Sequence, residues 1–267
     1  MKWKIIYLTL IGVLTFTLTA CTNNDDYAND NPNNDDYANG YEDDNLNNDY
    51  ANDNSNEDAL AFKLEHEELN GVPHPDIEDR IFKDMYVSEH NPFRYVEYDE
   101  IIELLENGTG IVYFGFPNCP WCRNLVPVLT DAAIEFGVEE ILYRNVWYDR
   151  NILELEDGEI VETRAGHPGY YQVLDILGDL APAYRGLYDE SIRRVFVPAV
   201  VFVSNGEIIS YYENLPTFQE RVDEEELGGW LPMNDEEVEE LKQTFINYFE
   251  ILFGDDLCPA DGDRSDC

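Results

Sequence analysis

Two cysteines, two residues apart, stand where the hydrophobic pattern of the chain changes its period. The stretch GIVYFGF, residues 110–116, is an unbroken apolar run of the kind that forms a buried strand. From Pro120 onward, apolar residues recur at helical spacing until Gly137, which predicts a helix that stops there. Cys119 and Cys122 therefore lie at a predicted strand-to-helix turn.

The rest of the pattern predicts how this junction is completed into a fold. Further elements are expected over residues 98–107 (helix), 139–149 (strand), 171–187 (helix) and 234–254 (helix). Residues 154–171 are expected to form a polar turn, and two β-branched and aromatic runs flank Asn205-Gly206, the strongest short hairpin signal. Strands joined through helices are parallel and hairpin strands are antiparallel. We therefore expect an α/β fold with a central mixed sheet flanked by helices.

The position of the cysteine pair gives it a reason to be reactive. Free N–H groups and the dipole at a helix N-terminus favour a thiolate there. Pro120 suits the first helical turn, where no N–H is needed. The short spacing lets the second sulfur close a small disulfide, so we expect Cys119 to be the attacking, more exposed thiol and Cys122 the resolving thiol. Arg123 is expected to point outward, which leaves moderate thiol acidity.

The beginning of the chain has the pattern of an export signal. Two lysines precede a short apolar run, too short for a membrane span, in residues 1–20. LTAC, residues 18–21, resembles the bacterial lipoprotein signal, which implies a lipid on Cys21; an ordinary signal peptide with a coincidental cysteine is the alternative. Residues 21–58 repeat NNDDYAN and are expected to be a disordered Asn/Asp-rich tether, with calcium binding as the alternative. The expected location is extracytoplasmic, lipid-anchored to the bacterial cell membrane.

The remaining cysteines limit the alternatives. Disulfides persist in exported proteins, so Cys258 and Cys267 are expected to form a structural disulfide, with a second redox relay as the alternative. A zinc ribbon would repeat the two-residue spacing, which the eight-residue gap of this pair does not. We expect no metal, and no cofactor besides the redox-active disulfide Cys119–Cys122. The formal charge of -41 excludes a general nucleic-acid binder.

Residues 97–254 resemble the thioredoxin superfamily. The resemblance rests on the strand GIVYFGF, the CPWC sequence at the helix start, the stretch VFVPAVVFVSNGE and the terminal helix. It implies a thioredoxin fold with a cis-proline, Val197-Pro198, before the C-terminal hairpin. In that family the proline packs against the cysteine pair, and the backbone of the residue before it, here Val197, pairs with a substrate strand.

Three features depart from thioredoxin itself. The spacer between the cysteines is Pro120-Trp121, which is more similar to the spacers of glutaredoxins and of bacterial disulfide oxidases. Trp121 is expected either to border a substrate groove or to pack on a neighbouring loop. Tyr113 stands where thioredoxins place a buried Asp. Residues 150–190 make a longer connection than the minimal fold. The whole arrangement is similar to thioredoxin-like lipoproteins of Gram-positive bacteria, including bacteriocin-transport accessory proteins.

These observations predict a membrane-anchored extracytoplasmic thiol–disulfide oxidoreductase. Its partners would be Cys-containing exported proteins and an unidentified membrane or secreted redox partner. A non-catalytic thioredoxin-fold protein-binding module is the alternative, and the presence of Cys119, Cys122 and Pro198 together argues against it. His74 and His167 are expected to be loop residues. The expected organisation is a signal peptide (1–20), the tether (21–58), an N-terminal extension (59–96), the thioredoxin-like domain (97–254) and a Cys-containing tail (255–267).

Overall fold

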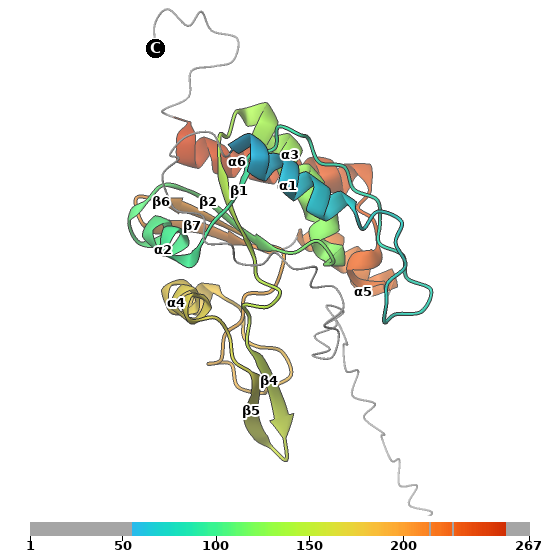
Figure 1. Ribbon diagram of the computed structural model, residues 1–267, viewed down its shortest axis with the longest axis vertical. Helices are drawn as coiled ribbons and strands as arrows, with labels where there is room; N and C mark the ends of the chain where they lie inside the picture. Colours follow the sequence, from blue (N-terminus) through green and yellow to red (C-terminus); the bar gives the residue numbers. More distant parts are fainter. Residues whose placement is uncertain (1–54, 214, 226, 255–267) are drawn as a thin grey trace, which may run out of the picture.

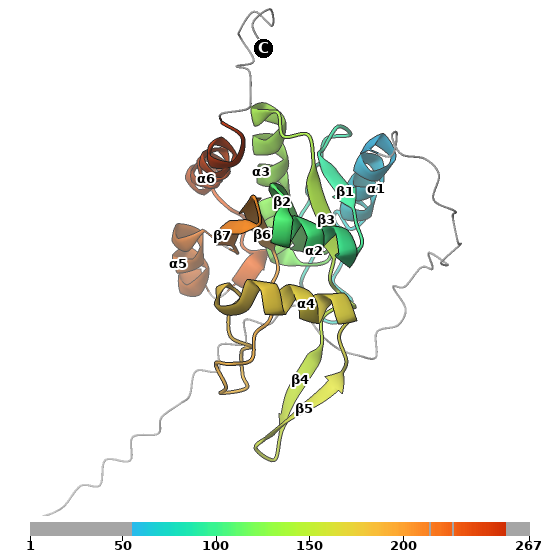
Figure 2. The same ribbon diagram turned by 90° about the vertical axis from the view of Figure 1, so that its left-hand side faces the viewer.

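A five-stranded mixed sheet with helices on both faces forms the body of the protein. The computed structural model describes residues 55–254 except 214 and 226. The predicted lipidation site Cys21, most of the tether, and the pair Cys258 and Cys267 lie outside the described residues. Figures 1 and 2 show the helices α1, α3 and α6 on one side of the sheet and α2 and α4 on the other.

The strand order of the sheet is β1-β3-β2-β6-β7. Its strands are β1 (Phe93–Tyr95), β2 (Gly110–Gly115), β3 (Ile141–Asn145), β6 (Ala199–Ser204) and β7 (Glu207–Tyr212). β3 runs parallel to both β1 and β2, whereas β6 is antiparallel to β2 and to β7. Both central strands, β2 and β6, are buried almost throughout, as expected of strands covered on two faces.

Three of the helices, α2, α3 and α6, begin and end near the residues that the sequence predicted. The helices are α1 (Ser55–Glu67), α2 (Tyr98–Asn107), α3 (Pro120–Phe136), α4 (Pro168–Leu177), α5 (Pro216–Glu225) and α6 (Asp235–Phe253). α3 ends at Gly137 in a left-handed conformation with φ 88, which glycine adopts without strain. α6 begins with a capping box formed by Asn234 and Glu237.

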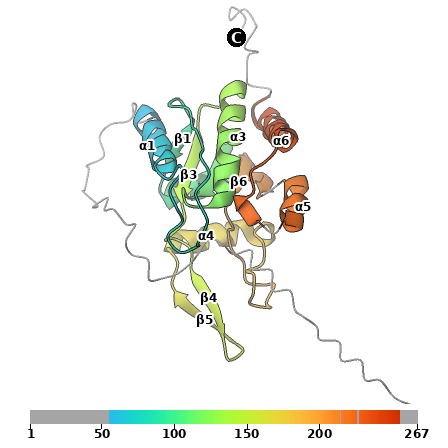
Figure 3. The same cartoon turned by 90° about the vertical axis from the view of Figure 1, so that its right-hand side faces the viewer.

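The polar turn predicted over residues 154–171 is wrong. This segment forms a hairpin of β4 (Ile152–Glu156) and β5 (Glu159–Arg164) that projects from the body of the molecule (Figure 3). Apolar and acidic residues alternate over residues 153–156, just before Asp157-Gly158. The φ angles of this pair are positive, and an Asp-Gly pair after such a run is itself a hairpin signal. The helix that follows, α4, starts at Pro168 and ends ten residues earlier than the predicted 187.

Two further segments add to the predicted framework. α1 begins at Ser55, inside the range predicted as tether, and β1 pairs with β3 as an edge strand of the main sheet. The sheet therefore draws on residues expected to form an extension. Between β7 and α6, α5 and the short helix η3 (Gly228–Trp230) lie near the beginning of α3.

The predicted proline geometry is confirmed. The Val197–Pro198 bond is cis, and it immediately precedes β6 of the C-terminal hairpin. Together with the mixed sheet and the helices on both faces, it gives the chain a thioredoxin-like fold. In the part of the chain that the structure describes, no helix combines the length and apolar character needed to cross a membrane.

Candidate functional site

The cysteine pair occupies the first turn of α3, as predicted. Cys119 is the N-cap residue of the helix, and Pro120 takes the first helical position. The backbone N–H of Cys122 donates to the Cys119 sulfur at 3.3 Å. The sulfur therefore replaces the oxygen of an ordinary capping side chain, which places it where a helix stabilises negative charge.

The loop before β6 lies against this sulfur. The Cys119 thiol is 3.7 Å from the carbonyl oxygen of Val197, to which it donates a hydrogen bond. Val197 is followed by the cis Pro198, so the segment implied by the family resemblance does border the cysteine pair. The structure thus brings together residues that are 78 positions apart in the sequence.

Both thiols are buried, which differs from the expected exposure of Cys119. Cys119 and Cys122 are free thiols, and their exposed fractions are 2% and 0%. Cys119 is thus only marginally the more exposed of the two. A protein substrate can reach it only if the residues that cover it move.

Burial also changes the predicted acidity of the pair. It raises the pKa of Cys119 well above its usual value, and the hydrogen bond between the two cysteines adds to this; the backbone groups of Cys122 and Trp121 oppose the change. Burial acts on Cys122 in the same direction, but hydrogen bonds from Cys119 and Tyr113 outweigh it and lower its pKa. The first negative charge of the reduced pair is therefore favoured on Cys122, with the Cys119 thiol as donor.

Two aromatic residues of the predicted strand 110–116 pack in the core beside the cysteine pair. Tyr113 on β2 is fully buried and stacks on Tyr143 of β3, with ring centroids 5.4 Å apart. Phe116 is fully buried and packs edge-on against Trp147 at 4.7 Å. The guanidinium of Arg150 lies over the ring of Phe116, 5.1 Å from its centroid.

Arg150 is a site residue that the sequence did not reveal. Its charge is one of the causes that lower the pKa of Cys122. Its side chain is buried, with 2% exposed, although it follows β3 by five residues. Nothing in its local sequence distinguishes it from a surface arginine, because only the folding of β3 beside β2 brings it to the cysteines.

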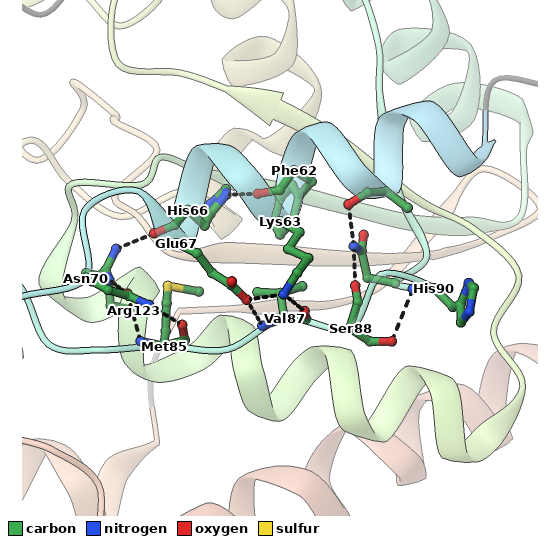
Figure 4. Close-up of polar contacts among 12 residues, drawn as sticks. Phe62, Lys63, His66, Glu67, Asn70, Met85, Val87, Ser88, His90 and Arg123 are labelled. Atoms are coloured by element: carbon green, nitrogen blue, oxygen red, sulfur yellow. Dashed lines mark hydrogen bonds and ion pairs between the residues drawn. The ribbon is translucent and has the colours of Figure 1, made fainter.

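Arg123 was expected to point outward, and this expectation is wrong. Its side chain is completely buried. The guanidinium donates to three backbone carbonyls, those of Lys83 at 2.7 Å, His66 at 2.8 Å and Pro117 at 3.1 Å, and to the side chain of Asn70. Figure 4 shows it reaching from α3 to His66 and Asn70. A buried cation is tolerated here because each of these acceptors faces it.

The acceptors come mainly from the N-terminal segment, residues 55–92. His66 in this segment is completely buried, and its Nδ1 lies 2.8 Å from the Phe62 carbonyl. Burial lowers the pKa of His66 to about 3, and the nearby charge of Arg123 acts in the same direction. His66 is therefore neutral at physiological pH, and Arg123 carries the positive charge of this cluster.

Trp121 packs on a neighbouring segment, which is the alternative to bordering an open groove. Its ring meets that of Phe218 on α5 edge-on, with centroids 5.6 Å apart. Gly229 of η3 lies so close to Trp121 that an added Cβ would be 2.7 Å from its ring. We call α5, η3 and Leu231 the cover segment. It lies over the spacer between the two cysteines.

Asn124 fastens this cover segment to α3. Its side-chain amide donates to the carbonyls of Gly229 at 2.8 Å and Leu231 at 2.9 Å. Its side-chain oxygen accepts from Lys83 at 2.8 Å. Asn124 is 3% exposed, so these bonds are shielded from water. One side chain therefore joins α3 to both of the segments that flank it.

The two histidines singled out in the sequence have structural roles in loops. His167 is the N-cap of α4 and accepts from Gly169 at 3.0 Å. His74 accepts from the backbone N–H groups of Asp76 and Ile77 at 3.1 Å. Among the residues with described positions, no group of three or more His, Cys, Asp or Glu side chains could hold a metal ion.

Comparison with known proteins adds two structures of similar architecture. No protein-family model matches the chain. No curated protein matches it either. Among solved structures, thioredoxin O2 from Arabidopsis thaliana in the oxidized state is 12% identical and covers 52% of this chain and 96% of its own, with a TM-score of 0.29. Thioredoxin O1 from the same plant is 13% identical and covers 52% and 99%, with a TM-score of 0.27. Similarity at this identity and TM-score carries no information about the activity of this chain. The thioredoxin-like fold is identified by the strand order and the cis Val197–Pro198 bond.

Proposed function

We propose that the protein is a thiol–disulfide oxidoreductase that acts on cysteines of exported proteins through Cys119 and Cys122. The observation that carries this proposal is the placement of the Cys119 sulfur. It caps α3 by accepting the N–H of Cys122, and it lies 3.7 Å from the carbonyl oxygen of Val197. A structural cysteine needs neither contact. The N–H favours a sulfur that carries charge during the reaction, and Val197 is the residue whose backbone is implied by the family resemblance to pair with a substrate strand.

The reaction follows from the pair in two steps. In the reducing direction, Cys119 as thiolate attacks one sulfur of a substrate disulfide, and the other substrate sulfur leaves and takes up a proton. Cys122 then attacks Cys119, which forms the Cys119–Cys122 disulfide and releases the second substrate thiol. Two electrons and two protons pass from the protein to the substrate. The oxidising direction is the reverse of these steps.

The decisive experiment is a count of free thiols with and without a mild reductant. A pair that cycles between dithiol and disulfide supports the enzyme, and a Cys119→Ser, Cys122→Ser chain corrects for the other three cysteines. A Cys122→Ser chain is expected to trap partners as mixed disulfides through Cys119. Equal trapping by Cys119→Ser would contradict the assigned roles.

The burial of both sulfurs favours a second candidate, a thioredoxin-fold module that binds proteins without redox chemistry. The two functions differ in one outcome. A binding module would keep the same thiol count under mild oxidation and mild reduction, since its cysteines serve only packing.

The direction of electron flow depends on how strongly the thiolate is stabilised. The equilibrium potential of the pair against glutathione measures this. A value near about -270 mV would indicate a reductase, and one near about -120 mV an oxidase.

We further propose that the protein is lipid-anchored outside the cytoplasm, as a thioredoxin-like accessory lipoprotein of secretion. The support is the LTAC sequence at Cys21 after a short apolar run. Cys21→Ala is expected to release the protein from the membrane fraction. Retention of this variant in the membrane would contradict the lipid anchor.

A further inference from the structure

The hydroxyl of Tyr113 is directed toward the cysteine end of β2. Tyr113 and Gly115 lie on the same face of the strand because side chains alternate. A Cβ added at Gly115 would overlap the Tyr113 hydroxyl and the ring carbon that bears it. The tyrosine side chain therefore runs along the strand toward its C-terminal end, over the space that glycine leaves open, and the loop with Cys119 follows that end.

This hydroxyl is buried without a hydrogen bond of normal geometry. Tyr113 is completely buried, and its oxygen has no such partner. The ring of Tyr113 packs against the rings of Tyr143, Phe93 and Phe62, at centroid distances of 5.4, 5.5 and 6.5 Å. A buried tyrosine hydroxyl usually has a partner, so an unpaired one calls for an explanation.

Cys122 is the polar group that interacts most strongly with this hydroxyl. The pKa of Tyr113 is raised well above its usual value. Burial is the largest cause, and the Cys122 sulfur is the second. Conversely, Tyr113 is one of the hydrogen-bond donors that lower the pKa of Cys122. The phenol therefore keeps its proton at neutral pH, and it acts as a donor and not as a base.

We propose that the Tyr113 hydroxyl is a dedicated hydrogen-bond donor to the sulfur of Cys122, and that it stabilises this sulfur as a thiolate when Cys119 is held in a mixed disulfide. The inference rests on the proposed function and names a residue of the resolving step. In that state Cys119 has lost its S–H and no longer donates to Cys122, so Tyr113 is the side-chain donor that remains. Gly115 is needed because it leaves room for the hydroxyl.

The step is balanced without proton transfer to the tyrosine. Cys122 loses its proton, and its sulfur attacks Cys119; the bond between Cys119 and the substrate sulfur breaks as the Cys119–Cys122 bond forms. The substrate leaves as a thiolate and takes up one proton from solvent, which replaces the proton lost from Cys122. Tyr113 keeps its own proton throughout and lowers the energy of the attacking sulfur.

The test uses the full chain with Cys119→Ala, which removes the other side-chain donor as the mixed disulfide does. Cysteine labelled with ¹³C at Cβ reports the ionisation of Cys122, whose signal is identified by its loss in Cys122→Ser. Adding Tyr113→Phe is expected to reduce the thiolate fraction of Cys122 at a fixed pH below its midpoint by about 10- to 100-fold, since a hydrogen bond to a charged group is lost.

Tyr143→Phe is the matched control. Tyr143 is equally buried, stacks on Tyr113 and also has an unpaired hydroxyl. Its pKa, however, is raised first by burial and then by Glu65 and Tyr95. Tyr143→Phe is expected to change the Cys122 titration less than about twofold. An unchanged titration in Tyr113→Phe, or an equal change in both variants, would overturn the proposal.

A second measurement keeps the test decisive if Tyr113→Phe folds poorly. Site-specific 3-fluorotyrosine at position 113 preserves the shape and makes the phenol a stronger donor, so the thiolate fraction of Cys122 should rise. A fall or no change contradicts the proposal. The titration does not depend on turnover: a pair that fails to cycle refutes the oxidoreductase, whereas equal titrations refute only the role of Tyr113.

Discussion

Replacing Asn124 with alanine should release the cover segment from α3. Asn124 is the residue whose amide reaches the carbonyls of Gly229 and Leu231, at 2.8 and 2.9 Å. Trp121 and Phe218 would still pack against each other. The substitution therefore weakens the closed position without removing the aromatic contact that guides the segment back.

The size of the effect follows from these two hydrogen bonds. Each contributes about 0.5–1.5 kcal/mol net, so Asn124→Ala should lower the free energy of opening by about 1–3 kcal/mol. If Cys119 reacts only when the cover segment opens, its reaction rate should rise by about 5- to 140-fold, since about 1.4 kcal/mol corresponds to tenfold.

The assay is the rate at which iodoacetamide alkylates Cys119 in the reduced, folded protein, read by mass spectrometry of the peptide. Asn91→Ala is the matched control. Asn91 is also buried, with 5% exposed, and its amide donates to two carbonyls, those of Ala59 at 2.7 Å and Ser88 at 2.8 Å. It should lower the stability of the fold to a similar extent, but it holds the N-terminal segment and not the cover segment.

A rate increase confined to Asn124→Ala would establish that this segment controls access to Cys119. The reasoning is refuted if both variants alkylate Cys119 equally fast. In that case access would follow the unfolding of the whole domain, and the bonds of Asn124 would have no special relation to the site.

Two further predictions concern the buried charge cluster. Arg123→Met should lower the free energy of unfolding by about 2–4 kcal/mol. Three backbone carbonyls would lose a buried donor, at about 1–3 kcal/mol each, and the surrounding structure would partly relax. Urea unfolding measures this change, and a loss below about 1 kcal/mol would contradict the account. The pKa of His66 is about 3 in the folded protein and near 6.5 in the unfolded chain, so between these values only the unfolded chain binds the proton and stability falls as the pH falls. From pH 7.5 to pH 5 this amounts to about 2 kcal/mol, which His66→Gln should abolish; an unchanged pH slope in that variant would show that other groups set it.

The framework of the fold was predictable because its signals are local. The change of period at Pro120, the glycine at 137 and the Asn205-Gly206 turn each fix an element through backbone chemistry near that residue. The position of the cysteine pair followed from the same signals. The β4–β5 hairpin was missed because its many glutamates suggested a solvated loop, although Asp157-Gly158 marked its turn.

The surroundings of the cysteines could not be predicted in the same way. Arg123 has the sequence context of a solvent-exposed helical residue, and only the arrival of residues 66–83 beside α3 turns it inward. Asn124 and Gly229 are 105 positions apart, and no local pattern joins them. The exposure of a side chain depends on which distant segment packs on it, and periodicity carries no information about that.

The dependence of Arg123 on the N-terminal segment defines what can fold alone. A chain that begins at residue 97 would keep both cysteines, the cis-proline and four of the five sheet strands. It would lose the carbonyls of His66 and Lys83 and the side chain of Asn70, and would leave a guanidinium uncovered one residue after Cys122. A protease that cut between Leu69 and Lys83 is therefore expected to disturb the surroundings of Cys119 and Cys122 without cutting near either cysteine. We therefore expect a stably folded unit of this protein to include α1 and the loop after it, since residues synthesised before α3 supply the acceptors that α3 needs.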